Sequence, residues 1–258
     1  MRTVVVIPAR FGSTRLPGKP LLNATGKFLI QHVYEQARKA TAPAGVVVAT
    51  DDDRIRAAVE SFGGTAVLTR PDHPSGTDRV AEVAARLDAD AVINLQGDEP
   101  LFDPAAIDLL AGLVADPAAD VATLAAPIRD RASYLSPHVV KVVCDDRGRA
   151  LYFSRSPIPH YRAGEPSFDE PGADAPGSPP ALQHLGVYAY RRDVLLKLAA
   201  TPPHPLERAE KLEQLRVLGT GGTIRVGVVP AAHRGIDTPA DYEAFVEFCR
   251  SGESRRAA

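Results

Sequence analysis

The sequence predicts an α/β fold built on a mainly parallel, doubly wound sheet. Residues 4–7 form an unbroken β-branched run, which is typical of a strand buried on both faces of a parallel sheet. Strand and helix patterns then alternate along residues 29–124, an order that favours right-handed crossovers and helices on both faces of the sheet. The chain has 258 residues, 45% of them hydrophobic and 24% charged, which is a globular composition. We therefore expect a single domain over residues 1–258.

Apolar periodicity locates the elements that follow the first strand. Helices are expected where apolar residues recur every three or four positions, and strands where they form short runs. The predicted order is a helix over 29–37, a strand over 46–49, a helix over 55–62, a strand over 65–68, a helix over 80–87, a strand over 91–95, a helix over 107–114 and a strand over 121–124. Because parallel strands end at one edge, the loops after the first four strands should gather there, where open α/β sheets bind ligands.

The alternation stops after residue 124, which predicts an excursion at about 130–190. Residues 139–143 and 151–153 predict two strands joined by a short turn, a hairpin that leaves the main sheet. The stretch 160–181 is dense in proline, glycine and acidic residues, so it is either a mobile substrate-side loop or a disordered segment without function. The hairpin exposes strand edges that need covering, so we expect a homodimer. Later patterns predict a strand over 185–190, one helix over 206–218, a strand over 223–229 and a closing helix around 242–246.

The loop after the first strand carries clustered cations. It has no apolar periodicity, and its glycines and prolines hold Arg10, Arg15 and Lys19 on an irregular backbone. Glycine lets backbone N–H groups approach phosphate oxygens, while two guanidinium groups and an ammonium supply compensating charge. The loop therefore favours a polyphosphate ligand. It matches neither of the common glycine-rich phosphate motifs, so an ordinary solvated turn is the alternative.

Composition limits the classes of function. The net charge of −2 and the pI near 6.4 argue against a protein that coats nucleic acid. No apolar run approaches the roughly 18 residues that span a bilayer, and no signal-peptide pattern precedes the first strand. We therefore expect no membrane contact and a cytoplasmic location. Cys144 and Cys249 lie far apart without metal-ligand companions, so both are expected to be buried free thiols.

Two carboxylates stand where strands are expected to end. Asp98 follows a buried strand and a glycine, and Asp237 stands just before the closing helix. Either one could simply cap a helix. Two carboxylates beside a cationic phosphate loop also suit Mg²⁺, which takes few protein oxygens and completes an octahedron with water and substrate phosphates. The sequence thus favours a magnesium site at Asp98 and Asp237.

Other polar residues suit the rest of a nucleotide. Ser75, Asp78 and Arg79 precede a helix whose N-terminal N–H groups could face a ribose or a base. Ordinary helix capping explains the same pattern. Gln96 offers both a donor and an acceptor, which suits the edge of a pyrimidine.

Linked motifs run through nearly the whole chain. They are Ile-Pro-Ala-Arg at 7–10, Ser-Thr-Arg-Leu-Pro-Gly-Lys-Pro-Leu at 13–21, Ala-Thr-Asp-Asp at 49–52, Ser-Gly-Thr-Asp-Arg at 75–79, Gln-Gly-Asp-Glu-Pro at 96–100, Val-Lys-Val-Val at 140–143, Phe-Ser-Arg-Ser-Pro-Ile-Pro at 153–159, His-Leu-Gly-Val-Tyr-Ala-Tyr-Arg at 184–191, the stretch 207–216, and Ile-Asp-Thr-Pro at 236–239. With these motifs the sequence resembles the 3-deoxy-manno-octulosonate cytidylyltransferase family. It departs from the family pattern at Phe28, where proline is usual, at Pro74, and in the long stretch 160–181.

The resemblance implies a Rossmann-like nucleotidyltransferase fold, with the excursion serving the sugar side and the dimer contacts. It implies a reaction of CTP with Kdo (3-deoxy-D-manno-oct-2-ulosonate) that gives CMP-Kdo and pyrophosphate for lipopolysaccharide biosynthesis, with Mg²⁺ as cofactor. The anomeric hydroxyl would attack the α-phosphorus in line. The alternatives are a cytidylyltransferase for another acid sugar, such as a sialic acid or 8-amino-Kdo, and a non-catalytic nucleotide-sugar-binding regulator.

The resemblance also implies roles for particular residues. The residues implied in catalysis are Lys19, Asp98, Asp237, Arg10 and Arg15. The nucleotide would contact Pro8, Ala9, Arg10, Arg15, Lys19, Thr50, Asp51, Ser75, Asp78, Arg79, Gln96 and Asp98. Asp98 and Asp237 would hold the metal. The sugar carboxylate would meet Arg155, for which an ordinary surface ion pair is the alternative, and the sugar hydroxyls would meet His184, Tyr188, Glu210 and Gln214.

Overall fold

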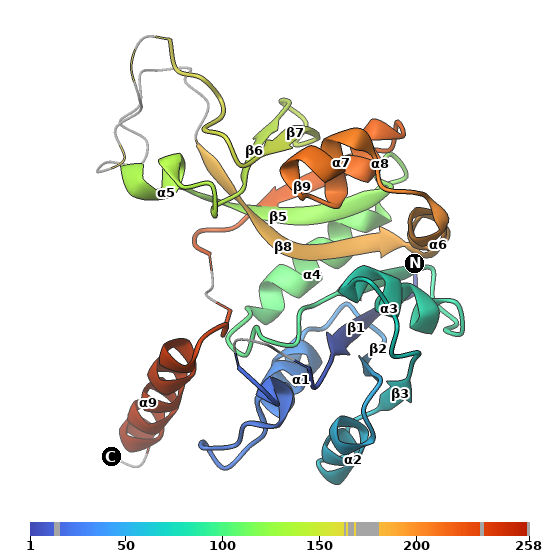
Figure 1. The fold of residues 1–258 in the computed structure, drawn as a ribbon, viewed down its shortest axis with the longest axis vertical. Helices are drawn as coiled ribbons and strands as arrows, with labels where there is room; N and C mark the ends of the chain where they lie inside the picture. The colour runs from blue at the N-terminus through green and yellow to red at the C-terminus, as the bar shows by residue number, and fades with distance from the viewer. Residues whose placement is uncertain (13–15, 163, 165–167, 169–180, 233–234, 257–258) are drawn as a thin grey trace. The chain divides into compact units, whose positions relative to one another are not determined.

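The fold is that of a computed structural model, which describes residues 1–12, 16–162, 164, 168, 181–232 and 235–256. The chain groups into two compact units. The first consists of Met1–Asp108 and His233–Ala258, and the second consists of Leu109–Ala232. Figure 1 colours the chain from the N-terminus to the C-terminus. Arg15 and most of the stretch 160–181 lie outside the described residues. The assignment of residues 1–258 to a single domain stays a prediction.

The first unit contains a parallel sheet in the order β3-β2-β1-β4. β1 (Thr3–Ala9) is flanked by β2 (Gly45–Thr50) and β4 (Ala91–Asn94), and β3 (Ala66–Leu68) pairs with β2. All these pairings are parallel. The β-branched residues 5–7 are fully buried, as the run predicts. The α/β fold with a mainly parallel sheet is confirmed.

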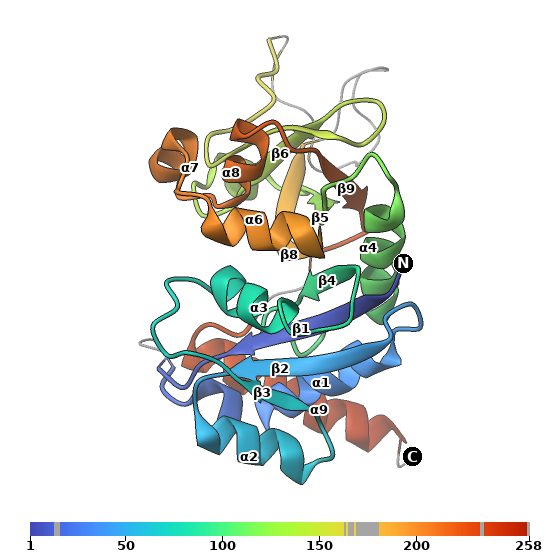
Figure 2. The same ribbon diagram turned by 90° about the vertical axis from the view of Figure 1, so that its right-hand side faces the viewer.

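Helices cover both faces of this sheet. In Figure 2, α3 (Gly76–Ala84) lies on one face, and α1 (Leu29–Lys39) and α2 (Asp53–Ser61) lie on the other. Each helix buries one stripe of apolar side chains at helical spacing, which is the arrangement expected of amphipathic helices on a sheet.

The closing helix α9 (Pro239–Arg256) also belongs to this unit. Its Phe245 packs in one apolar cluster with Leu16 and Ile236. Leu16 precedes the short 3-10 helix Lys19–Leu21. The cluster therefore holds the segment before α9 beside the loop that follows β1.

The second unit is built on β5 (Val121–Pro127), which pairs in parallel with β9 (Ile224–Val228) and antiparallel with β8 (Leu182–Arg191). β6 (Lys141–Cys144) and β7 (Ala150–Ser154) form the predicted antiparallel hairpin. The expectation that this hairpin leaves the main sheet is wrong, because β6 also pairs with the start of β8.

Helices in the second unit are less regular. α4 (Pro104–Ala115) begins in the first unit and ends in the second. The apolar pattern does not predict α5 (Arg131–Leu135) or α6 (Arg192–Ala200). α5 buries a single side chain and α6 buries two, so neither displays a full apolar stripe in the sequence.

Two helices replace the single one expected over residues 206–218. They are α7 (Pro205–Glu210) and α8 (Gln214–Gly219). The break falls at Lys211, whose backbone is left-handed with a φ of 56°. A right-handed helix cannot continue through that conformation. The break places Glu210 and Gln214 on different helices.

Two other expectations can be compared with the structure. Within the part of the chain that the structure describes, no helix is long and apolar enough to cross a membrane. Cys144 and Cys249 are free thiols, but they are half-buried rather than buried. Burial, and then the charge of Asp145, raise the pKa of the Cys144 thiol to about 11, so this thiol stays protonated and unreactive at neutral pH.

Candidate active site

Lys19 joins the loop after β1 to the two carboxylates predicted to hold magnesium. Its ammonium lies 2.7 Å from Asp98 Oδ2 and 3.4 Å from Asp237 Oδ1. It also donates to the carbonyl of Ile236 at 2.8 Å, and the Ile236 N–H donates to the Asp98 carbonyl at 2.8 Å. The structure thus brings three predicted catalytic residues together at the carboxyl edge of the first unit's sheet.

Each helix beside these carboxylates has a cap of its own. The carboxylate of Asp103 accepts from an N–H in the first turn of α4 at 2.9 Å. At the start of α9, Asp241 Oδ2 accepts from the Thr238 N–H at 2.8 Å, and Thr238 Oγ1 accepts from the Asp241 N–H at 3.2 Å. Helix capping therefore does not account for Asp98 or Asp237 at these positions.

A third carboxyl group adjoins the pair. Glu99 Oε2 is buried and has no hydrogen-bond partner among the described residues. Burial, followed by the negative charges of Asp98 and Asp237, raises the pKa of Glu99 to about 7. Three acidic groups therefore lie close together, and only two of them contact the ammonium of Lys19, an arrangement that favours binding of a further cation.

The donor set fits Mg²⁺. Carboxylate oxygens are hard ligands, which this ion prefers. Over the described ranges, no group of three His, Cys, Asp or Glu side chains is arranged to hold a metal by itself. An ion at Asp98 and Asp237 must therefore take its other ligands from water and substrate, as Mg²⁺ does beside nucleotide phosphates.

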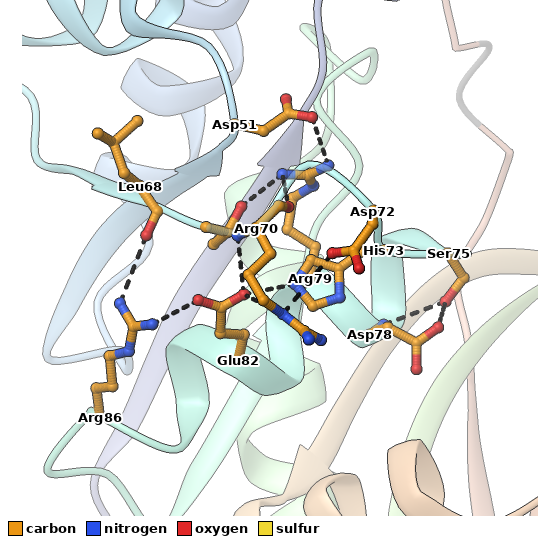
Figure 3. A network of polar contacts seen from close by, with 11 residues as sticks. Asp51, Leu68, Arg70, Asp72, His73, Ser75, Asp78, Arg79, Glu82 and Arg86 are labelled. Atoms are coloured by element: carbon orange, nitrogen blue, oxygen red, sulfur yellow. Dashed lines mark hydrogen bonds and ion pairs between the residues drawn. The ribbon is translucent and has the colours of Figure 1, made fainter.

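Arg79, which was expected to contact the nucleotide, is buried and engaged with the protein. Its guanidinium donates to Asp51 Oδ2 at 3.0 Å, to Thr69 Oγ1 at 2.5 Å and to the carbonyl of Arg70 at 3.3 Å (Figure 3). Only 5% of its side chain is exposed. Arg79 and Asp51 therefore fix the loops that follow β2 and β3 relative to each other.

Ser75 caps α3. Its hydroxyl donates to Asp78 Oδ2 at 2.7 Å and accepts from the Asp78 N–H at 3.1 Å. The capping interpretation of these two side chains is confirmed, and contact with a nucleotide stays a prediction for both.

Glu82, one turn further along α3, holds the loop that leads to this cap. It accepts from the Arg70 N–H at 3.0 Å and lies 2.5 Å from His73 Nε2 and 2.5 Å from a guanidinium nitrogen of Arg86 (Figure 3). Burial acts to raise the pKa of Glu82, but the Arg70 N–H, His73 and Arg86 lower it overall. This network places Ser75 by fixing the chain just before it.

Gln96 presents an acceptor at the end of β4. Its Nε2 donates to Asn94 Oδ1 at 3.0 Å, which leaves Oε1 for a ligand. A Cβ added to Gly76 would lie 3.7 Å from this Oε1 and 3.5 Å from Pro8 Cγ. Gly76 therefore leaves room between Gln96 and Pro8, two residues predicted to bind the nucleotide.

The other nucleotide residues differ in exposure. Ala9 and Thr50 are buried at the ends of β1 and β2, so only backbone atoms of Ala9 could meet a ligand. Arg10 is exposed directly after β1, where a phosphate could reach its guanidinium. Arg15 lies outside the described residues, and its role stays a prediction.

A cation–π contact between Arg54 and Phe11, which no sequence pattern predicts, holds the start of the cationic loop in place. The guanidinium carbon of Arg54 lies 3.5 Å from the ring centroid of Phe11, and Arg54 also pairs with Asp52 at 2.6 Å. The Gly18 N–H donates to the Phe11 carbonyl at 3.2 Å, and Gly18 has a φ of 65°. Glycine adopts this left-handed conformation without strain. The loop that carries Arg10 and Lys19 is thereby held against α2.

In the second unit, Arg155 and Glu210 brace each other. Arg155 Nε donates to the Glu210 carbonyl at 2.7 Å, and Nη1 donates to the Pro137 carbonyl at 2.9 Å. Glu210 in turn accepts from the Arg155 N–H at 2.9 Å and from the Ser154 hydroxyl at 2.6 Å. These contacts are structural, and only the remaining guanidinium N–H groups of Arg155 could meet a sugar carboxylate.

Lys141, which the sequence does not single out as a site residue, holds the backbone at Arg155. It is fully buried, and its ammonium donates to the carbonyls of Ser136, Val139 and Arg155 at 2.8, 2.6 and 2.6 Å. Desolvation, and then the charge of Arg155, lower the pKa of Lys141. Its three acceptors satisfy all three ammonium hydrogens.

The residues predicted for the sugar hydroxyls offer polar atoms in an apolar setting. The rings of His184 and Tyr188 lie 5.4 Å apart on β8. Gln214 is 5% exposed, and its Nε2 has no hydrogen-bond partner in the described structure. Buried polar atoms normally have a partner, so this amide suits a hydroxyl ligand. Burial, and then the charge of Glu213, raise the pKa of Tyr188, so its hydroxyl remains a donor.

His184 should contribute to the pH dependence of stability. Desolvation lowers the pKa of its imidazole from 6.5 to about 3. The unfolded chain then binds this proton more tightly, so the contribution is complete above pH 6.5 and is lost as the pH falls toward 3. We expect His184→Gln to show a shallower loss of unfolding free energy over that range, measured by urea denaturation. The exposed His138 provides the control variant His138→Gln, which should keep the wild-type slope; parallel curves for wild type and His184→Gln would contradict the expectation.

Comparison with known proteins defines the class to which this fold and site belong. A family model described as cytidylyltransferase matches residues 4–224. A curated relative from Geobacter metallireducens, named 3-deoxy-manno-octulosonate cytidylyltransferase, is 50% identical over 248 residues, which cover 96% of this chain and 97% of the relative. A relative of the same name from Escherichia coli is 50% identical over 243 residues, with 94% of each chain covered.

Solved structures agree with these relatives. One described as CMP:2-keto-3-deoxy-manno-octonic acid synthetase complexed with CTP is 47% identical, has a TM-score of 0.88, and covers 98% of this chain and 100% of its own. A cytidylyltransferase from Leptospira borgpetersenii is 20% identical with a TM-score of 0.59 over 95% of this chain and 85% of its own, and so shares the fold. The chain belongs to the 3-deoxy-manno-octulosonate cytidylyltransferase family, as its motifs predict.

Proposed function

We propose that this chain transfers the cytidylyl group of CTP to Kdo, releasing pyrophosphate and supplying CMP-Kdo for lipopolysaccharide biosynthesis. The observation that carries the proposal is the contact of Lys19 with both Asp98 and Asp237 beside the cationic loop. A nucleotide-binding regulator would need neither carboxylate, so their joint presence disfavours that alternative. The relatives at 50% identity support Kdo over a sialic acid or 8-amino-Kdo.

Catalysis of this reaction asks the protein to position two substrates and to neutralise charge. The anomeric hydroxyl of the sugar loses its proton to solvent and attacks the α-phosphorus of CTP, and the bond to pyrophosphate breaks on the opposite side. Arg10, Arg15 and Lys19 stabilise the charge that builds on the leaving pyrophosphate. Asp98 and Asp237 would hold Mg²⁺, which when bound would supply positive charge to the triphosphate and acidify the sugar hydroxyl.

We expect a strong preference for CTP. Gln96 Nε2 is engaged by Asn94, so Oε1 is left to accept from the amino group of cytosine, whereas uracil offers only an acceptor at that position. Pyrophosphate release in the presence of Kdo should be at least about a hundredfold faster with CTP than with UTP, and it should also be faster with CTP than with ATP or GTP. Equal turnover with a purine triphosphate would refute the assignment.

We also propose that the protein is a homodimer that uses the hairpin of β6 and β7. Leu151 on β7 is 62% exposed and Val228 on β9 is 55% exposed, and large apolar side chains on strand edges are typical of covered surfaces. Sedimentation equilibrium at micromolar concentration should give twice the chain mass of 27.5 kDa, and Leu151→Asp should give one chain mass. Leu206→Asp on α7, where Leu206 is 40% exposed, is the control; a monomeric wild type would contradict the proposal.

We propose a cytoplasmic location, because CTP is made and consumed in that compartment. CTP and Kdo are the partners that the site supports, and the mildly acidic net charge of −2 disfavours nucleic acid.

A further inference from the structure

An irregular stretch of β8 separates two residues of the sugar side. Thr123 on β5 pairs with Tyr188, but the next residue, Leu124, pairs with Leu185. Residues 186–187 are therefore extra on β8, which makes a β-bulge. Bulges re-aim side chains and are often found beside active sites. Here the bulge lies between His184 and Tyr188.

The hydroxyl of Thr123 fills the bulge. Thr123 is fully buried, and its Oγ1 lies 2.7 Å from the Val187 carbonyl, 3.2 Å from the Leu185 carbonyl and 3.0 Å from His184 Nε2. A hydroxyl has one hydrogen to donate, and a carbonyl can only accept.

These three neighbours determine where the hydrogens lie. If Thr123 donated to His184 Nε2, its lone pairs would face two carbonyl oxygens at 2.7 and 3.2 Å with no hydrogen between them. If it donates to the Val187 carbonyl, it can accept a hydrogen from Nε2 instead, so both of these short contacts have a hydrogen between their atoms. The second arrangement requires neutral His184 to carry its hydrogen on Nε2.

The imidazole of His184 remains neutral near neutral pH, so the position of its single N–H hydrogen determines which ring nitrogen can accept a hydrogen bond. The ring of Phe153 meets that of His184 edge-on at 5.0 Å, and the ring of Tyr188 lies 5.4 Å away. Desolvation lowers the pKa of His184 to about 3. In a neutral imidazole one nitrogen donates and the other accepts, so the Nε2–H form leaves Nδ1 as an acceptor.

We propose that Thr123 is a positioning residue that fixes His184 in the Nε2–H tautomer and so presents Nδ1 as an acceptor for a hydroxyl of the sugar substrate. The second half of this inference rests on the proposed function, in which His184 meets a sugar hydroxyl. The first half concerns the ligand-free protein and stands on the contacts of Thr123 alone. A hydroxyl on the substrate would donate to Nδ1, which discriminates against a sugar that has only an acceptor there.

The tautomer can be measured directly by NMR of protein labelled with ¹⁵N in its seven histidines, with His184→Gln used to assign the His184 signals. We expect the hydrogen on Nε2 in the wild type and in Thr123→Ser, which keeps the hydroxyl. In Thr123→Val, which keeps the shape, the hydrogen should be shared between the two nitrogens. A hydrogen on Nδ1 in the wild type, or an unchanged Nε2–H signal in Thr123→Val, would overturn the proposal.

Kinetics test the second half. Loss of one hydrogen bond to the sugar should raise the KM for Kdo roughly tenfold in Thr123→Val, while the KM for CTP stays unchanged and Thr123→Ser remains near wild type. An equal rise in both KM values would indicate general damage and would contradict a positioning role. If Kdo is not a substrate at all, the proposed function fails, whereas the tautomer of the ligand-free protein is still read independently. If Thr123→Val does not fold, the wild-type spectrum and Thr123→Ser decide the question.

Discussion

Asp98→Asn should lower turnover by roughly a thousandfold while leaving the fold intact. In the wild type, Lys19 Nζ lies 2.7 Å from Asp98 Oδ2. The amide keeps the shape of the carboxylate and an oxygen that can accept from Lys19, but it removes the charge that would hold Mg²⁺. Turnover measured at saturating Mg²⁺, together with a melting curve, checks both statements.

The same loop supplies a matched control. Asp103 is exposed and caps α4, and asparagine caps a helix about as well as aspartate, so Asp103→Asn should retain activity and stability. Asp237→Asn should behave like Asp98→Asn, and the double variant should be little worse than either, because groups that act as a unit are not additive. Near-normal turnover in Asp98→Asn would end the two-carboxylate mechanism.

Lys19→Met should lower turnover by roughly a hundredfold and make the melting temperature strongly dependent on Mg²⁺. Its ammonium contacts two carboxylates, and only 14% of its side chain is exposed. Removal leaves Asp98, Asp237 and the adjoining Glu99 without that positive charge, so a divalent cation should restore stability that the variant lacks.

The measurement compares melting curves with and without Mg²⁺ for wild type, Lys19→Met and Lys39→Met. Lys39 is exposed at the end of α1 and should show the wild-type response. A rise in melting temperature on adding Mg²⁺ that is no larger in Lys19→Met than in wild type would show that Lys19 does not offset the charge of the acidic site.

The parts of the fold that could be predicted are those in which the sequence repeats one signal. Residues 4–7 are four β-branched residues in a row, and the helices of the first unit each show a full apolar stripe. The break at Lys211 could not be predicted in this way, because a left-handed lysine leaves no mark in an apolar pattern. The helix α6 could not be predicted for a related reason, because it buries only Leu195 and Leu198 and so shows no full apolar stripe.

In the candidate site, too, some features could be predicted from the sequence and others could not. Asp98 and Lys19 could be proposed because strand ends meet at one edge of a parallel sheet. Whether Asp98 was a cap could not be decided from the sequence, because the answer depends on Asp103 occupying that position. Contact of Arg79 with the nucleotide stays a prediction, but its pairing with Asp51 could not be predicted, because only the structure shows how deeply a basic side chain is buried. The role of Thr123 depends on a β-bulge, which no local pattern reveals.

The most direct test of the account is the release of pyrophosphate from CTP with Kdo present or absent and with Mg²⁺ present or removed by a chelator. The product should also be identified as CMP-Kdo, with sialic acid and 8-amino-Kdo as competing acceptors. We expect rapid release only when CTP, Kdo and Mg²⁺ are all present, and slower release with either of the other sugars. Release that does not need Mg²⁺, or that proceeds as well without Kdo, would contradict it.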